Sequence, residues 1–193
     1  MTLHNFLLQQ NFVRSDYESY FYVCKNPSTG EETMIAVCVG NLVIISSSDP
    51  SIVRDLKLSF ASRFEITDLG SLTQILGIKV VRDRRNKCFF LCQASFVKGT
   101  TIAKFGLDFL PAVCTTPMDH TVDLSPSPRY VCALQDANRY RSSMVGTLAW
   151  LSNWTRPELA FAVHKLQRSQ SNPEPEHFEA AERVFSLSQG HSV

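Results

Sequence analysis

Apolar and β-branched residues gather in short runs in the first half of the chain, a pattern typical of strands. The clearest case is 33–46, where two such runs flank a break at Gly40-Asn41. Glycine at the first turn position supplies a positive φ, so the pattern predicts a β-hairpin with a type II′ turn at Gly40-Asn41. Further strands are predicted at 20–25, 75–81 and 88–92, with the polar segment 82–87 joining the last two.

Apolar residues recur at three- and four-residue steps in other segments, and this spacing predicts helices. Asp49-Pro50 begins one of them, because Asp is a favoured N-cap and Pro fits the first helical position. The apolar face of this helix comprises Ile52, Val53, Leu56, Phe60 and Phe64. Other helices are predicted at 3–12, 95–105 with a stop at Gly106, 138–153, a segment from Pro157 to Leu166, and a last one around 178–185.

The order of these elements bears on the fold class. Strands come early and helices late, which favours an α+β fold over a doubly wound parallel sheet. The segment 111–128 carries four prolines and few periodic positions, which is typical of a linker. The predicted domains are therefore 1–110, a Pro-rich linker at 111–137 and a helical region at 138–193.

Charge is balanced over the whole chain but not locally. Lys plus Arg number 19 against 18 for Asp plus Glu, so any attraction to nucleic acid must come from a local patch. One patch stands out between two predicted strands, where five cations face Asp83 alone: Lys79, Arg82, Arg84, Arg85 and Lys87. The alternative interpretation is an ordinary solvated turn. Arg156 is a second candidate, or it only orders the start of the helix at Pro157.

Localisation signals are missing from the sequence as given. No window approaches the roughly 18 apolar residues of a membrane span, and the first residues lack the basic and small-residue signature of a signal peptide. The six cysteines include no Cys-x-x-Cys pair, which favours reduced thiols. We therefore expect an intracellular protein, cytoplasmic or nuclear, that is neither secreted nor bound to a membrane.

Short motifs follow one another in a fixed order along the chain. They are NFVRS at 11–15, FEITDLG at 64–70, LGI at 76–78, QASF at 93–96, FG at 105–106, TPM at 116–118, YR at 140–141, GTL at 146–148, TRPE at 155–158 and P-x-x-x-H at 173–177. In this order they resemble copia-type retrotransposon reverse transcriptases, with Asn11 in place of the family's Gly. The resemblance covers nearly the whole chain.

The resemblance implies a particular part of a polymerase. The chain is expected to hold a partial palm of antiparallel hairpins plus helices, followed by a mostly helical thumb and connection region. The fingers and the first catalytic Asp would lie before Met1, and an RNase H domain would lie after Val193. The expected partners are the rest of a Pol polyprotein and, weakly, an RNA or DNA template-primer gripped by the basic segment.

The hairpin at 33–46 matches the family's catalytic hairpin, whose tip has Tyr-Val-Asp-Asp. Here the four positions are Cys38, Val39, Gly40 and Asn41. Such polymerases are expected to use two Mg²⁺ ions, and carboxylate oxygens are the ligands that these hard ions need. Gly40 offers no side-chain ligand and Asn41 only a neutral amide, so we predict no catalytic residues, no metal site, no cofactor and no polymerase activity.

No other catalytic pattern emerges. The five histidines are scattered, His164 and His177 are expected to be packing or surface groups, and Glu174, Glu176, Glu179 and Glu182 are expected to form a solvated face. Three interpretations stay open. The chain is an inactive reverse-transcriptase fragment, a non-catalytic remnant that still binds nucleic acid or a partner, or a gene-model relic that forms no stable protein.

Overall fold

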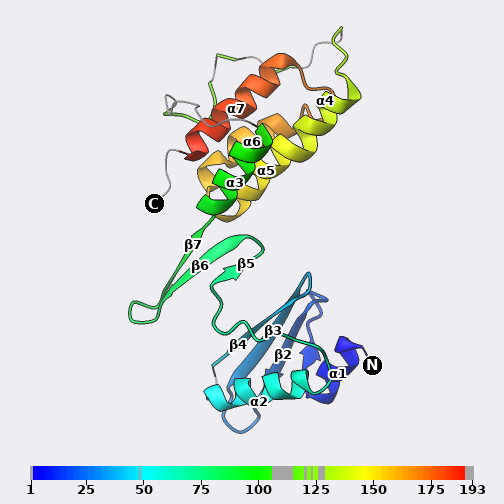
Figure 1. The fold of residues 1–193 in the computed structure, drawn as a ribbon, viewed down its shortest axis with the longest axis vertical. Helices are drawn as coiled ribbons and strands as arrows, with labels where there is room; N and C mark the ends of the chain where they lie inside the picture. Colours follow the sequence, from blue (N-terminus) through cyan, green and yellow to red (C-terminus); the bar gives the residue numbers. More distant parts are fainter. Residues whose placement is uncertain are drawn as a thin grey trace. The chain divides into compact units, whose positions relative to one another are not determined.

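A computed structural model describes residues 2–47, 49–105, 115–119, 121–122, 124–125 and 129–189. It contains two antiparallel sheets and a set of helices, which confirms the α+β class (Figure 1). The chain divides into two compact units, Met1–Leu72 and Thr73–Val193. The predicted domain boundaries at residues 110 and 137 differ from the boundary between these two units, and they stay a prediction.

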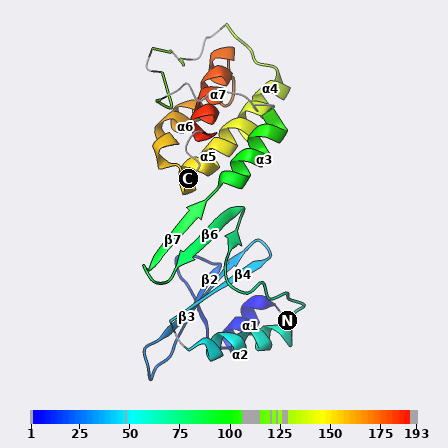
Figure 2. The ribbon, with the colours of Figure 1, turned by 60° about the vertical axis from the view of Figure 1, so that its left-hand side comes forward.

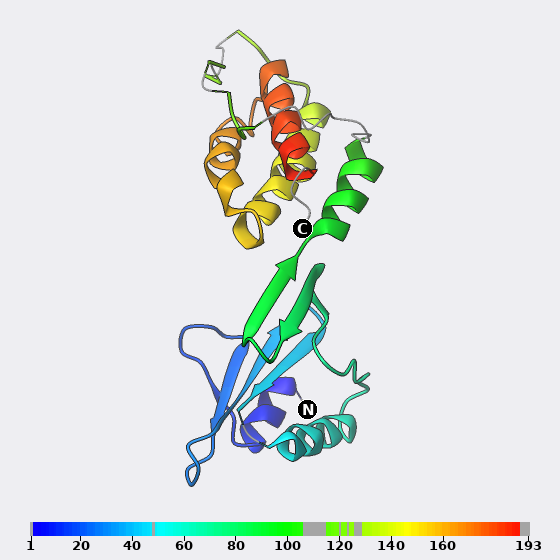
Figure 3. The same cartoon turned by 90° about the vertical axis from the view of Figure 1, so that its left-hand side faces the viewer.

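The first unit is a four-stranded sheet with two helices. The elements are α1 (Leu3–Gln9), β1 (Val13–Arg14), β2 (Phe21–Lys25), β3 (Glu32–Cys38), β4 (Asn41–Ser46) and α2 (Pro50–Ala61). The strands lie in sequence order, and every neighbouring pair is antiparallel. Both helices cover the same face of this sheet (Figure 3).

Aromatic side chains form the core between the helices and that face. Tyr22 and Ile35 lie opposite each other on β2 and β3, and both are buried. Above them the ring of Phe6 in α1 lies 5.1 Å from that of Phe60 in α2 and 5.3 Å from that of Phe64. These edge and tilted contacts join the two helices, so the sheet and both helices share one apolar cluster.

The start of α2 is as the sequence predicts. The Asp49 carboxylate accepts a hydrogen bond from the Ser51 N–H at 2.7 Å, and this bond lowers the pKa of Asp49. Leu56 and Phe60 are buried on the predicted face, whereas Ile52 is exposed at the first turn. The apolar face therefore begins one turn later than its sequence pattern suggests.

The second unit begins with a three-stranded sheet and continues into helices. The elements are β5 (Gln74–Ile75), β6 (Ile78–Asp83), β7 (Cys88–Cys92), α3 (Ala94–Phe105), α4 (Leu134–Asn138), the π-helical η1 (Arg139–Val145), α5 (Gly146–Trp154), the 3₁₀ turn η2 (Pro157–Leu159), α6 (Ala160–Gln167) and α7 (Pro175–Gln189). The chain runs from β7 straight into α3 (Figure 2), which contacts α7 and shares one hydrophobic core with α5 and α6.

The predicted apolar faces of the later helices form this core. Leu159, Ala162, Val163 and Leu166 are all buried, and so are Ala181, Val184 and Phe185 of α7. Tyr140 is fully buried among them, and its O–H donates to the Leu166 carbonyl at 3.2 Å. Burial raises the pKa of Tyr140, so this phenol stays a hydrogen-bond donor at any ordinary pH.

Two predicted elements are wrong in detail. The strand predicted at 75–81 is broken by a turn at Leu76-Gly77, where both residues have positive φ (50° and 80°), so β5 folds back on β6. The helix predicted at 138–153 is not regular, because its first half is the π-helical η1. In this wider π-helical turn, the side chains of Tyr140, Met144 and Val145 are all buried in the core.

Polar residues of the helical unit occupy the places predicted for them. His177 is a packing group, 1% exposed, whose Nδ1 accepts from the Glu174 N–H while Nε2 donates to the Leu124 carbonyl. Of the four glutamates predicted to form a solvated face, Glu176 and Glu179 are exposed, whereas Glu174 and Glu182 are half-buried. Met118 and Leu124, from the segment predicted to be a linker, pack against the core.

Some predictions fall on residues outside the described part of the chain. These are Gly106 as the stop of α3, His120, His191 and much of the Pro-rich segment. Among the described residues, no helix combines the length and the apolar character that crossing a bilayer requires.

Candidate functional site

The tip of the β3–β4 hairpin is the first candidate site. Cys38 and Asn41 form its last cross-strand pair, so the turn residues are Val39 and Gly40. Their φ angles are 34° and 81°, and positive values at both positions belong to a type I′ turn. The predicted type II′ turn at Gly40-Asn41 is therefore wrong, because the turn lies one residue earlier.

This turn places a β-branched residue in an unfavourable conformation. A positive φ is rare for valine, since its branched Cβ crowds the following carbonyl. Val39 is also 91% exposed, so no packing around it compensates for this strain. Gly40 has the same sign of φ without penalty, and an added Cβ there would meet open space.

The chemistry of the tip does not suit divalent cations. Gly40 presents no donor atom, and the Asn41 side chain is a neutral amide at the exposed start of β4. Within the described residues, no group of three or more His, Cys, Asp or Glu side chains converges to hold a metal ion. Mg²⁺ sites are built from carboxylates. The residues at this tip therefore do not fit a two-magnesium centre.

The β6–β7 hairpin is the second candidate site, and its turn is organised by Asp83. The Asp83 carboxylate accepts from the backbone N–H of Arg85 at 3.0 Å and of Asn86 at 3.1 Å, and from the Asn86 side chain at 2.7 Å. Hydrogen bonds from Asn86 hold the pKa of Asp83 below its ordinary value. Lys87 closes the loop with a left-handed φ of 55°.

This use of Asp83 leaves the cations of the hairpin without an anionic partner. Its carboxylate is engaged by N–H groups of the loop, and within the described part of the chain none of the five cations has an ion-pair partner. All five are exposed: Lys79, Arg82, Arg84, Arg85 and Lys87. The structure thus brings every residue of the predicted basic patch onto one hairpin.

Exposed aromatic residues lie on the same hairpin, and the sequence reasoning missed them. Phe89 and Phe90 are 61% and 59% exposed. Phe89 pairs with Arg82 across the strands, and the Arg82 guanidinium carbon lies 5.2 Å from the centre of its ring. The available signal was the pair Phe89-Phe90 itself, because adjacent strand residues point to opposite faces and one face of a small hairpin is open.

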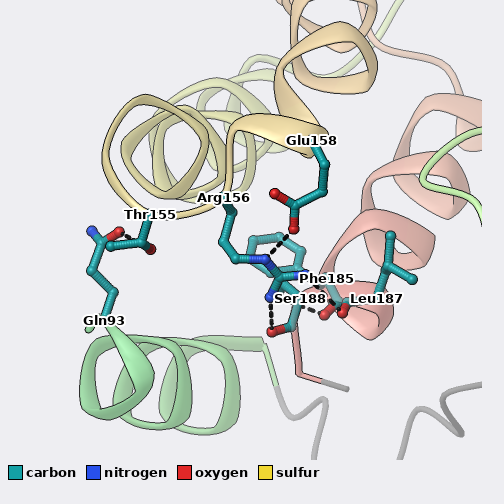
Figure 4. A network of polar contacts seen from close by, with 7 residues as sticks. All are labelled: Gln93, Thr155, Arg156, Glu158, Phe185, Leu187 and Ser188. Carbon is teal, nitrogen blue, oxygen red and sulfur yellow. Dashed lines mark hydrogen bonds and ion pairs between the residues drawn. The ribbon is translucent and has the colours of Figure 1, made fainter. Parts of the chain in front are cut away.

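Arg156, the other basic candidate, binds the protein itself. Its guanidinium donates to the Ser188 carbonyl at 2.7 Å and to the Leu187 carbonyl at 3.3 Å, and it forms an ion pair with Glu158 (Figure 4). These carbonyls belong to the last turn of α7, where helix carbonyls lack intrahelical partners. Arg156 therefore caps α7 from the loop after α5, and it is not available for phosphate.

The same loop also contacts the start of α3. The Thr155 hydroxyl donates to Gln93 Oε1 at 2.6 Å (Figure 4). Gln93 is 3% exposed, and its Nε2 has no partner among the described residues. Residues 93, 155 and 156 belong to two of the motifs noted in the sequence, and here they join α3, α5 and α7.

Comparison with known proteins identifies the family. A model of the reverse transcriptase (RNA-dependent DNA polymerase) family matches residues 1–120, more than half of the chain. The chain belongs to the reverse transcriptase family. The motif-based resemblance to copia-type reverse transcriptases is thereby confirmed.

The reverse transcriptase chain is similar to transposon Pol proteins over almost its whole length. It is 26% identical over 193 residues to the retrovirus-related Pol polyprotein from transposon TNT 1-94 of Nicotiana tabacum. It is 26% identical over 188 residues to that from transposon RE1 of Arabidopsis thaliana, and 28% identical over 186 residues to a transposon Ty5-1 protein of Saccharomyces cerevisiae. These alignments cover 98%, 95% and 95% of this chain.

The relatives are longer than this reverse transcriptase chain. It spans 14% of the tobacco polyprotein, 12% of the Arabidopsis polyprotein and 56% of the yeast protein. No solved structure matches it.

Proposed function

We propose that this chain is a non-catalytic, nucleic-acid-binding part of a copia-type Pol polyprotein. The observation that carries the proposal is a contrast between two hairpins. The β3–β4 tip has Gly40 and Asn41 where the family has carboxylates, whereas the β6–β7 hairpin presents five cations with no ion-pair partner in the described residues.

The loss of polymerase chemistry follows from charge. Two dications about 4 Å apart repel each other strongly, and carboxylates make such a pair stable. Gly40 and Asn41 contribute no negative charge. If another part of a longer protein supplied one carboxylate, the two carboxylates expected from this tip would still be missing. We therefore propose that no Mg²⁺ pair forms here.

The retention of nucleic-acid binding follows from the second hairpin. Arginine and lysine bind phosphates and release condensed counterions, which supplies most of the non-specific affinity for nucleic acid. The matched family model is that of RNA-dependent DNA polymerases, and we propose that this hairpin lies near the primer and template. Unpaired cations on a rigid turn suit this role, because no internal ion pair has to be broken before a phosphate binds.

The cellular setting is part of the same proposal. We propose an intracellular protein, because templates for reverse transcription lie inside cells. None of the five described cysteines forms a disulfide, which agrees with a reducing compartment.

Removing two loop cations tests the binding proposal. We expect Arg84→Ala with Arg85→Ala to weaken binding to a labelled duplex about tenfold at moderate salt, because two phosphate contacts are lost. The slope of log affinity against log salt should fall in magnitude by about 2, at roughly 0.9 per contact. Fluorescence anisotropy over a salt series measures both quantities.

The matched control removes two exposed arginines from the helical unit. Arg139→Ala with Arg168→Ala changes the net charge of the chain equally, and both side chains are exposed. We expect this variant to bind like the wild type. An equal loss in both variants would show a diffuse charge effect, and wild-type protein that fails to bind would contradict the proposal.

A further inference from the structure

The exposed phenylalanine beside Arg82 carries an inference that rests on the proposed nucleic-acid binding. Phe89 projects its ring into solvent, with 61% of the residue exposed, and Phe90 beside it is 59% exposed. The Arg82 guanidinium lies over the ring at 5.2 Å from its centre. One cation is thus held against one side of an otherwise accessible aromatic surface.

The surroundings of Phe89 carry several cations. Arg82, Arg84, Lys87 and Phe89 line a shallow depression of about 260 Å³ together with Asp83 and Cys88. The Asp83 carboxylate at this place is engaged by the loop N–H groups, so its lone pairs do not bind these cations. The depression therefore combines a π surface with unpaired positive charge.

The strand register places Phe89 and Phe90 on opposite faces of the hairpin. Phe89 shares a face of the hairpin with Arg82, its cross-strand partner. Phe90 points to the opposite face, where its partner is the apolar Val81. Phe89 has a cation directly opposite it, whereas the nearest cation on the face of Phe90 is Lys79, two positions from Val81 along β6.

We propose that Phe89, backed by Arg82, stacks on an unpaired nucleobase, and that the hairpin binds single-stranded nucleic acid in preference to duplex. Aromatic side chains stack on bases of any sequence, and arginine adds a cation–π contribution. In a duplex both faces of each internal base are covered by neighbours, so Phe89 finds no partner there. The phosphates flanking the stacked base contact Arg84 and Lys87.

A comparison of three labelled probes tests this proposal. The probes are a single strand of about 12 nucleotides, within the site sizes of such binders, the same strand without bases, and a blunt duplex of equal length. The wild-type chain should bind the single strand at least about fivefold more tightly than either other probe. The strand without bases keeps the phosphates, so the difference isolates stacking.

Phe89→Ala should then weaken single-strand binding by about 5- to 100-fold and leave binding of the baseless strand within about twofold. Phe89→Trp should retain the preference, and its fluorescence should be quenched by the single strand alone. The matched control is Phe90→Ala, for which single-strand binding should stay within about twofold of the wild type. The exposure of both residues means that neither truncation removes core packing.

The other outcomes are distinct. Equal losses in Phe89→Ala and Phe90→Ala would overturn the stacking proposal in favour of a general apolar contact. Equal wild-type affinity for all three probes would overturn it while leaving phosphate binding intact. Failure to bind any probe, with self-association that Phe89→Ala abolishes, would overturn both proposals and assign the hairpin to protein contacts.

Discussion

Replacement of Phe60 by alanine is expected to lower the free energy of unfolding of the first unit by about 3–5 kcal/mol. Phe60 is 1% exposed, and its ring lies 5.1 Å from Phe6 and 6.4 Å from Phe64. It therefore links α1, α2 and the buried face of the sheet. The truncation leaves a cavity between two helices that both depend on this contact.

The size of the unit makes this loss severe. A unit spanning Met1–Leu72 is expected to have a stability of roughly 4–11 kcal/mol, at about 0.05–0.15 kcal/mol per residue. Urea unfolding followed by far-UV circular dichroism measures the change. The matched control is Leu58→Ala on the same helix, because Leu58 is 63% exposed and its loss should change stability by less than about 0.5 kcal/mol. Similar midpoints for both variants would contradict the packing described for Phe60.

Replacement of Arg156 by alanine is expected to destabilise the helical unit by about 2–4 kcal/mol, since it removes charged hydrogen bonds and a favourable charge at a helix C-terminus. The Arg156 side chain is 13% exposed, and its donors are directed at the Leu187 and Ser188 carbonyls. Without the guanidinium, the two hydrogen bonds to these carbonyls and the ion pair with Glu158 are lost. The end of α7 then separates from the loop after α5.

Tryptophan fluorescence follows this unit, because both tryptophans of the chain, Trp150 and Trp154, lie in α5. Arg156→Lys keeps the charge but not the planar fork, so it should recover less than half of the loss. Arg168→Ala, an exposed arginine after α6, should stay within about 0.5 kcal/mol of the wild type. An unfolding midpoint for Arg156→Ala equal to that of Arg168→Ala would show that the cap contributes nothing to stability.

Much of the fold could be predicted because local signals and burial agree. Asp49-Pro50 marks the start of α2, and Leu159, Ala162, Val163 and Leu166 face the core at the expected helical spacing. In these elements the residue that starts the helix and the residues that bury it lie within a few positions of each other. Both the start of each helix and its buried face can therefore be predicted from local sequence, without knowledge of long-range contacts.

The turn of the β3–β4 hairpin shows where prediction from local sequence fails. A turn at Gly40-Asn41 and one at Val39-Gly40 differ by two residues in strand pairing, which leaves the same side chains on the buried face. The alternation of apolar and polar residues along the strands therefore cannot distinguish the two turns. The observed register pairs Ile35 with Ile44, and Thr33 with Ser46, whose hydroxyls lie 2.8 Å apart. These cross-strand matches outweigh the strain at Val39.

The candidate site was predicted in part. All five cations of the β6–β7 hairpin lie where the charge pattern placed them, because a polar loop between two apolar strands has little choice of structure. The adjacent pair Phe89-Phe90 indicates that one of the two is exposed, but the exposure of both could not be predicted, since an apolar strand residue is normally buried. The capping role of Arg156 depends on α7, more than 30 positions away along the chain.

The central claim is that the β3–β4 tip cannot hold the metal ions of a polymerase. The most direct test is primer extension by the purified chain on an annealed template-primer, with Mg²⁺ and with Mn²⁺, beside an active reverse transcriptase and a reaction without template. Because Gly40 and Asn41 supply no anionic ligand, we predict no template-dependent product with either ion. Product whose sequence follows the template would contradict the account.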